Sequence, residues 1–255
     1  MSRSGSRDYF ASALTRVVRR VGDDGVLRPT LDQARVTEMR PFDSFARLAE
    51  FVLCDLRYPY DQGHKFETYG WVPAPYEKSV RTFDSGRSEQ GLWRNGAAEA
   101  DLLSCLIMDV DNDNDAQPML TPDEFAARMG STGPAGAAWF TYTSFSSRPE
   151  HPKLRAVIDT SRVLTRAESA SVFCWLNLHA LNQQGDSSIY DPGDYLYAPP
   201  CNTACQVGGD GPLDVDAILA EVAADPARYG PVQATKPRRA PARPLTPDEA
   251  ARLAE

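Results

Sequence analysis

The feature that most constrains the fold is an apolar run over residues 102–110, Leu-Leu-Ser-Cys-Leu-Ile-Met-Asp-Val, which leads into acidic residues. A strand that is apolar on nearly every position is typical of one that is buried on both faces. We therefore expect a central strand here, covered on each side by other elements. Its carboxyl end carries Asp109 and Asp111, so the sequence predicts carboxylates at one end of a buried sheet.

Further elements are expected on both sides of this strand. Thr121 with Glu124, and Thr165 with Glu168, have the spacing of capping boxes and predict helices over 122–129 and 166–181. Apolar runs predict strands over 137–144, 154–159 and 195–198. Helical spacing of apolar residues predicts a further helix over 214–224. The order β-α-β-β-α-β indicates a split β-α-β, ferredoxin-like sheet and an α+β class.

The two ends of the chain have different sequence patterns, helical near the N-terminus and proline-rich near the C-terminus. Helical spacing of apolar residues predicts helices over 8–21 and 43–58, the second capped by Asp43 or Ser44, and hence an N-terminal helical unit. Residues 59–100 read as loops with short strands. Residues 231–244 hold four prolines and no periodicity, which predicts a linker, and a third capping box begins at Thr246. We expect a domain over 1–230, with 231–255 as a Pro/Arg-rich linker and the start of a following helix or domain.

Composition excludes several classes of protein. The chain has 255 residues, of which 42% are hydrophobic, and no apolar run approaches the roughly 20 residues that a membrane span needs. Five cysteines, mostly in apolar segments, suit a reducing cytoplasm. The net charge of −8 disfavours a nucleic-acid partner at first sight. Because several acids cluster in 109–115 while bases gather elsewhere, the net charge decides nothing.

Asp109 and Asp111 are the first candidate site residues. Alternation along a strand places both side chains on one face, with Cα atoms roughly 7 Å apart. Two such carboxylates can bind one hard cation or bridge two. A solvated acidic turn is the alternative. An EF-hand loop does not fit, because Asn114 stands where that loop needs glycine.

A second group of candidates is basic or hydroxylic. Arg155 is on the strand predicted over 154–159 and Lys153 directly precedes it, so the two alternate on one strand face. Ser147 and His151 lie upstream of this pair and Arg162 lies downstream. Guanidinium, ammonium and hydroxyl donors could form a cradle for a triphosphate. The alternative is a polar hairpin loop with solvated bases. A third carboxylate, Asp191, precedes the short strand over 195–198 and could join the first two, although Asp-Pro-Gly-Asp is also an ordinary turn.

The chain thus has two carboxylates after an apolar strand, then a basic and hydroxylic group, then Asp191 before a short strand. In this order the three motifs resemble the archaeo-eukaryotic primase superfamily, specifically the primase-polymerase domains of phage and plasmid replication proteins. The resemblance spans about residues 45–225 and is strongest from 102 to 200. It implies a primase-like mixed sheet, template-directed synthesis and extension of primers from NTPs or dNTPs, and a single-stranded DNA template. It also implies two Mg²⁺ or Mn²⁺ ions, a helicase or other replication domain after the linker, and the cytoplasm of a bacterial or phage-infected cell.

The resemblance also assigns roles to residues. Asp109, Asp111 and Asp191 would bind the metal ions, and nucleotide phosphates would be bound by Arg155, His151, Lys153, Ser147 and Arg162. The superfamily commonly has a histidine where this chain has Arg155, so we place Arg155 first and His151 second for that role. Cys201 and Cys205 lack two further ligands, and no zinc site is expected.

Three other classes of function stay open at this point. A metal-dependent nuclease could use the same carboxylates, and so could a sugar-nucleotide transferase with an Asp-x-Asp metal site. A non-catalytic replication-initiation or DNA-binding module would use none of them as catalysts.

Overall fold

A computed structural model describes residues 8–14, 18–21, 27–30, 36–56, 70–76, 78–82, 86, 88–92, 102–131, 136–187, 189 and 195–229. These residues form a mixed α+β fold with two four-stranded antiparallel sheets, which confirms the predicted class. No helix in the described part of the chain is long and apolar enough to cross a membrane. Residues 231–255, predicted as a linker and a helix start, lie outside the described residues.

The first large sheet has the order β14-β10-β11-β9. Its strands are β9 (Leu106–Val110), β10 (Trp139–Thr143), β11 (Leu154–Ile158) and β14 (Cys205–Gly208). β11 runs antiparallel between β9 and β10, so β9, the intervening helix and β10 form the predicted split β-α-β unit. The prediction of one central strand over 102–110 is wrong. It divides into β8 (Leu102–Leu103) and β9, and β9 lies at the edge of this sheet.

The second large sheet has the order β13-β5-β1-β4. Its strands are β1 (Tyr9–Leu14), β4 (Val36–Phe42), β5 (Gly70–Val72) and β13 (Leu196–Tyr197). The predicted N-terminal helix over 8–21 is therefore wrong. β13, the strand expected over 195–198, pairs with β5 and belongs to this sheet, while β14 completes the first one.

Three two-stranded sheets complete the strand inventory of the described residues. Their pairs are β12 (Leu164–Thr165) with β8, β2 (Val18–Val21) with β3 (Leu27–Thr30), and β6 (Lys78–Thr82) with β7 (Ser88–Leu92). β2 occupies the end of the segment predicted as a helix. The N-terminal unit is thus mainly sheet, with one short helix.

The helices begin where capping residues predict them. Thr121 and Thr165 each form a capping box with a glutamate three residues on, at the starts of α2 (Pro122–Ser131) and α3 (Arg166–His179). Ser44 and Asp214 cap α1 (Phe45–Glu50) and α4 (Val215–Ala224). A π-helical turn over Phe51–Asp55 continues α1, and α5 (Pro226–Tyr229) follows α4.

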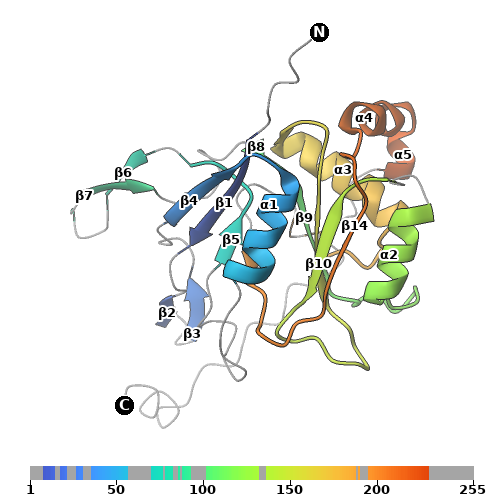
Figure 1. Cartoon of the computed structure of the whole chain (residues 1–255), viewed down its shortest axis with the longest axis horizontal. Coiled ribbons are helices and arrows are strands. Elements are labelled where there is room, and N and C mark those ends of the chain that lie inside the picture. Colours follow the sequence, from blue (N-terminus) through green and yellow to red (C-terminus); the bar gives the residue numbers. More distant parts are fainter. Residues whose placement is uncertain are drawn as a thin grey trace.

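Each face of the first sheet is covered by a separate hydrophobic core. Met108, Trp139 and Ile158 face α2, α3 and α4 in the larger core. On the other face, Ile107, Phe140 and Val157 pack against α1, the π-helical turn and the second sheet. Figure 1 shows α2 to α5 on one side of this sheet and β1, β4 and β5 on the other. The site residues described next belong to the face that meets the second sheet.

Candidate active site

A row of polar side chains crosses the first sheet at the end where β9 finishes. Asp109 on β9 pairs with Arg155 on β11, and Arg155 pairs with Tyr142 on β10. They continue the face that Ile107 and Val157 bury against the second sheet, because alternate residues of a strand share a face. Arg155 Nη2 lies 3.5 Å from Asp109 Oδ2. The predicted carboxylate and the predicted phosphate ligand therefore form an ion pair.

The Arg155 side chain is only 9% exposed. Its guanidinium carbon lies 5.6 Å from the centre of the Tyr197 ring, a cation–π contact. Burial acts to lower the pKa of Arg155, but Asp109, Tyr142, Asp111 and Tyr197 together outweigh it, and the pKa is raised. Two donors of this guanidinium, Nε and Nη1, are buried without a hydrogen-bond partner. Such a group stays charged and prefers an acceptor beside it.

Asp109 is buried to a similar degree, with its side chain 15% exposed. Burial raises its pKa, and the negative charges of Asp111 and Asp186 act in the same direction, whereas Arg155 opposes them. One carboxylate oxygen, Oδ1, is buried and has no hydrogen-bond partner. An unpaired buried carboxylate oxygen is costly, so a cation at this position would stabilise the site.

Asp111 follows directly after β9 and lies beside a second cation. Lys153 Nζ is 3.1 Å from Asp111 Oδ1 and 3.6 Å from Asp113 Oδ1. His151 Nε2 lies 2.9 Å from the Asp111 carbonyl oxygen and 3.5 Å from Asp113 Oδ1. Four of the predicted site residues, Asp109, Asp111, Lys153 and Arg155, are thus gathered in one group, and His151 borders it.

Asn112 explains why the acidic segment takes this position. Its φ of 56° ends the strand, and asparagine tolerates this left-handed conformation better than most residues. The buried amide nitrogen donates to the carbonyl groups of Leu120 and Pro152, and the amide oxygen accepts from the Leu120 N–H. One side chain therefore holds the segment after β9 against the loop that precedes β11.

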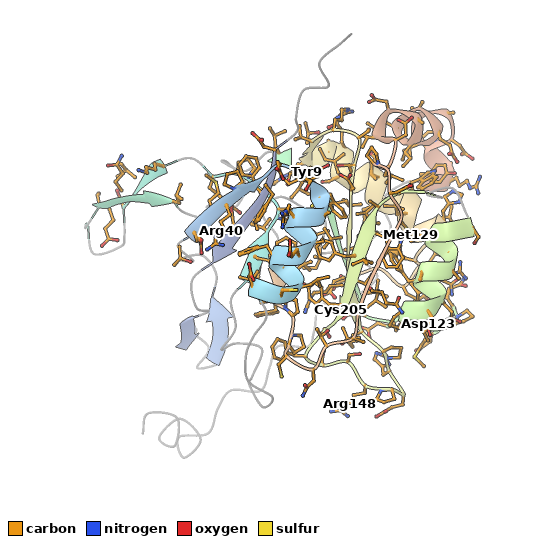
Figure 2. The ribbon with its side chains drawn as sticks, viewed as in Figure 1. Tyr9, Arg40, Asp123, Met129, Arg148 and Cys205 are labelled. Carbon is orange, nitrogen blue, oxygen red and sulfur yellow. The ribbon has the colours of Figure 1, made fainter. Side chains whose placement is uncertain are left out.

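Ser147 lies in that same loop and has a structural contact. Its hydroxyl accepts a hydrogen bond of 3.0 Å from the backbone N–H of Lys153. Figure 2 labels Arg148 at the tip of this loop, in the lower part of the view, and Tyr9 in the upper part. Ser147 thus shapes the loop from which Lys153 emerges.

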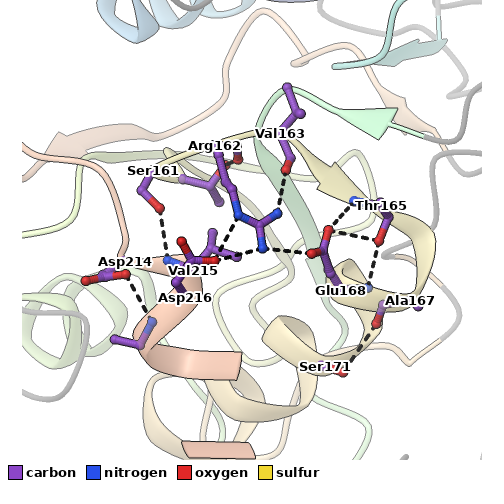
Figure 3. A network of polar contacts seen from close by, with 12 residues as sticks. Ser161, Arg162, Val163, Thr165, Ala167, Glu168, Ser171, Asp214, Val215 and Asp216 are labelled. Carbon is purple, nitrogen blue, oxygen red and sulfur yellow. Dashed lines mark hydrogen bonds and ion pairs between the residues drawn. The ribbon is translucent and has the colours of Figure 1, made fainter. Parts of the chain in front are cut away.

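Arg162 is not part of the group. It donates to Glu168 Oε1 at 2.7 Å and to Asp216 Oδ1 at 2.9 Å, which ties the start of α3 to the start of α4 (Figure 3). These hydrogen bonds raise the pKa of Arg162 and lower that of Glu168 to about 2. Arg162 follows the end of β11 that lies away from Asp109. In the structure it therefore links α3 to α4 and does not contact the described residues of the candidate site. Asp191 lies outside the described residues.

Two neighbours of the site were missed by sequence reasoning. Asp186 donates its backbone N–H to the Asp109 carbonyl oxygen at 2.7 Å, and its carboxylate adds negative charge beside Asp109. Tyr197 covers the Arg155 guanidinium from the second sheet. Asp186 carried no sequence signal, since it follows a helix in an ordinary polar turn. Tyr197 lies in the short strand predicted over 195–198, but the sequence pattern assigned a role only to Asp191 before that strand.

The donor set can be tested against the expected metal. Mg²⁺ and Mn²⁺ prefer carboxylate oxygens, Asp109 Oδ1 lacks a hydrogen-bond partner, and the Asp111 carboxylate is near enough for its charge to act on Asp109. This pair fits a divalent cation. Within the described ranges, no group of three or more His, Cys, Asp or Glu side chains is arranged to hold a metal ion.

No family model, curated protein or solved structure matches the chain.

Proposed function

We propose that this protein catalyses template-directed nucleotidyl transfer, the reaction of the primase-polymerase domains that its sequence resembles. One observation carries the proposal. At one end of the first sheet, each of two carboxylates lies beside a cation from the neighbouring strand or loop, Asp109 beside Arg155 and Asp111 beside Lys153. Carboxylates that bind a divalent cation, next to ammonium and guanidinium groups, suit a nucleoside triphosphate.

In this proposal each side chain has a separate task. Asp109 and Asp111 hold the divalent cation, which when bound neutralises phosphate charge and favours deprotonation of the attacking 3′-hydroxyl. Lys153, 19% exposed and on a flexible stem, exchanges Asp111 for a phosphate oxygen. Arg155 supplies fixed positive charge under the reacting phosphates, held in place by Asp109 and Tyr197.

A groove at the same end of the first sheet, between the start of α2 and the loop that precedes β11, supports a nucleic-acid strand as the second substrate. It has a volume of about 550 Å³. Its polar lining consists of hydroxyl groups, an amide and one guanidinium, and the rest of the lining is mostly proline; the polar residues are Thr121, Thr143, Ser144, Ser147, Asn202 and Arg148. None of the described residues that line it is acidic. Hydroxyls and arginine are common contacts of phosphate and sugar, so the groove suits a nucleic-acid backbone.

The test is a synthesis assay with the full chain. It contains a single-stranded template, labelled nucleotides and Mn²⁺, and the products are resolved by length. We expect products that depend on template and metal, and a loss of at least about 100-fold in Asp111→Asn because a metal ligand is removed. Asp115→Asn is the matched control, since Asp115 lies in the same acidic segment and is exposed.

The alternatives give different results in the same assay. Shortened template without nucleotide incorporation would identify a metal-dependent nuclease, and metal-dependent consumption of sugar nucleotides without DNA would identify a sugar-nucleotide transferase. A non-catalytic DNA-binding module has one observation in its favour, because Lys153 and Arg155 already compensate the two carboxylates. Template binding without synthesis, unchanged in Asp111→Asn, would establish that module and overturn the proposal.

A further inference from the structure

We infer that the Asp109–Asp111 pair binds one divalent cation, and that Arg155 permanently occupies the place of a second. The inference rests on the proposed function, whose family resemblance implies two metal ions. It depends on a difference between the two cationic side chains of the site. Arg155 is fixed in the core, and Lys153 is able to move.

Arg155 is fixed. β11 has a hydrogen-bonded neighbour on each side, β9 and β10, so the backbone of Arg155 cannot shift without disturbing the sheet. Its side chain is 9% exposed and lies against the Tyr197 ring. The Tyr142 hydroxyl bonds the Tyr197 carbonyl oxygen at 2.9 Å, and Tyr195 donates to the Tyr197 hydroxyl at 3.0 Å, so the covering ring is held as well. A guanidinium does not lose its proton in proteins.

The two oxygens of Asp109 differ as a consequence. Oδ2 faces Arg155 at 3.5 Å, whereas Oδ1 is buried without a hydrogen-bond partner. A divalent ion bound at Oδ2 would meet the guanidinium at close range, and repulsion between like charges in a poorly solvated site is strong. Only Oδ1 is suited to a metal ion.

Lys153 is the cation that can move. Its ammonium lies 3.1 Å from Asp111 Oδ1 and 3.6 Å from Asp113 Oδ1, at the end of a flexible four-carbon stem. A divalent ion between Asp109 Oδ1 and Asp111 would displace this ammonium toward Asp113 or a phosphate. One protein cation is therefore exchangeable and the other is not.

The charges of the described residues agree with a single ion. Asp109, Asp111, Asp113 and Asp186 bring four negative charges to the site, and Arg155 and Lys153 bring two positive charges. One divalent ion balances the two negative charges that remain on these described residues, whereas a second ion would leave a positive excess before any nucleotide binds.

The test counts Mn²⁺ ions bound to the full chain, by electron paramagnetic resonance titration of free Mn²⁺ and by calorimetry, without nucleotide. All proteins carry Asp115→Asn, which removes an exposed acid of the same segment, and they keep Asp113, which receives the displaced Lys153 ammonium. We expect one tight ion in this background, one in Arg155→Lys, which keeps the positive charge, and two in Arg155→Met, which removes it. Asp111→Asn should weaken the tight site at least tenfold.

Two tight ions in the Arg155-containing background, or none, would overturn the inference, and so would a single ion in folded Arg155→Met. If Arg155→Met does not fold, the count in the background protein still decides. The result is separable from the proposed function. One bound ion without nucleotide incorporation would leave the inference standing and reject the function, whereas two bound ions with incorporation would do the opposite.

Discussion

Nε1 of Trp71 on β5 donates a hydrogen bond of 3.0 Å to the hydroxyl of Tyr142 on β10, and this contact joins the two large sheets. The same hydroxyl donates to the Tyr197 carbonyl oxygen at 2.9 Å. Burial raises the pKa of Tyr142, so the phenol stays protonated and can keep its role as donor. Since Tyr142 pairs with Arg155 across β10 and β11, the link between the sheets also supports the candidate active site.

Replacing Tyr142 with phenylalanine tests this link. The Trp71 N–H and the Tyr197 carbonyl would each lose a partner in a buried environment, which costs about 1–3 kcal/mol. We expect the free energy of unfolding in urea to fall by that amount. Tyr195→Phe is the control, because Tyr195 is only partly buried, and it should change stability less. Equal effects of the two variants would contradict the role of the Tyr142 hydroxyl.

Asp109→Asn and Asp111→Asn should differ in stability without metal. Asp109→Asn leaves the buried Arg155 guanidinium without its counter-charge, and breaking a buried ion pair in this way costs about 3 kcal/mol. Asp111 and Lys153 are more exposed, so Asp111→Asn should cost less than about 1 kcal/mol. Denaturant unfolding of both variants in the presence of a chelator measures the difference. If Asp109→Asn unfolds like the unmodified chain, Arg155 does not depend on Asp109.

Glu168 predicts a pH dependence of stability. Its hydrogen bonds with Arg162 and Thr165 lower its pKa in the folded protein from 4.5 to about 2. A lowered pKa stabilises the folded state above the unfolded-state value, and this contribution is lost as the pH falls from 4.5 toward 2. The stability difference between the unmodified chain and Glu168→Gln should therefore be constant above about pH 5.5 and shrink below pH 4.5. A difference that persists unchanged to about pH 2 would refute this assignment.

Gly209 should not tolerate a side chain. Its φ is 67°, and an added Cβ would lie 1.8 Å from the Ala137 carbonyl oxygen. Gly209→Ala should therefore lower the free energy of unfolding by more than about 2 kcal/mol. Gly130→Ala in α2 is the matched control, because no atom lies within 4 Å of its added Cβ and alanine favours a helix. The control should be neutral or stabilising by up to about 1 kcal/mol in thermal or urea unfolding.

Local signals predicted most of the region around the first sheet. Thr121 and Thr165 mark helix starts because a capping box needs only residues three apart in the chain. β10 and β11 were found from their apolar runs, since both are buried on each face. The group of Asp109, Asp111, Lys153 and Arg155 was predicted as site residues, and the pairing of β9 with β11 brings them together.

Features set by distant pairing were not predictable in this way. Tyr9, Phe10 and Leu14 have helical spacing, but their segment is β1, which gains its hydrogen bonds from β4 and β5. Ala11 and Ser12 are both buried, so the strand shows no alternation of polar and apolar residues. Arg162 was assigned to nucleotide because of its motif, whereas its partner Asp216 comes from a helix 54 residues further along the chain.

The pairing of β13 with β5 has a consequence for synthesis of the chain on the ribosome. β1, β4 and β5 all lie within the first 72 residues, yet their sheet gains its last strand only at Leu196 and Tyr197. The Tyr197 carbonyl group that receives the Tyr142 hydroxyl arrives equally late. One edge of the early sheet therefore stays uncovered until almost half of the protein has followed these strands out of the exit tunnel. Such an edge can pair with other chains, so this is the interval in which a chaperone would protect the nascent protein most.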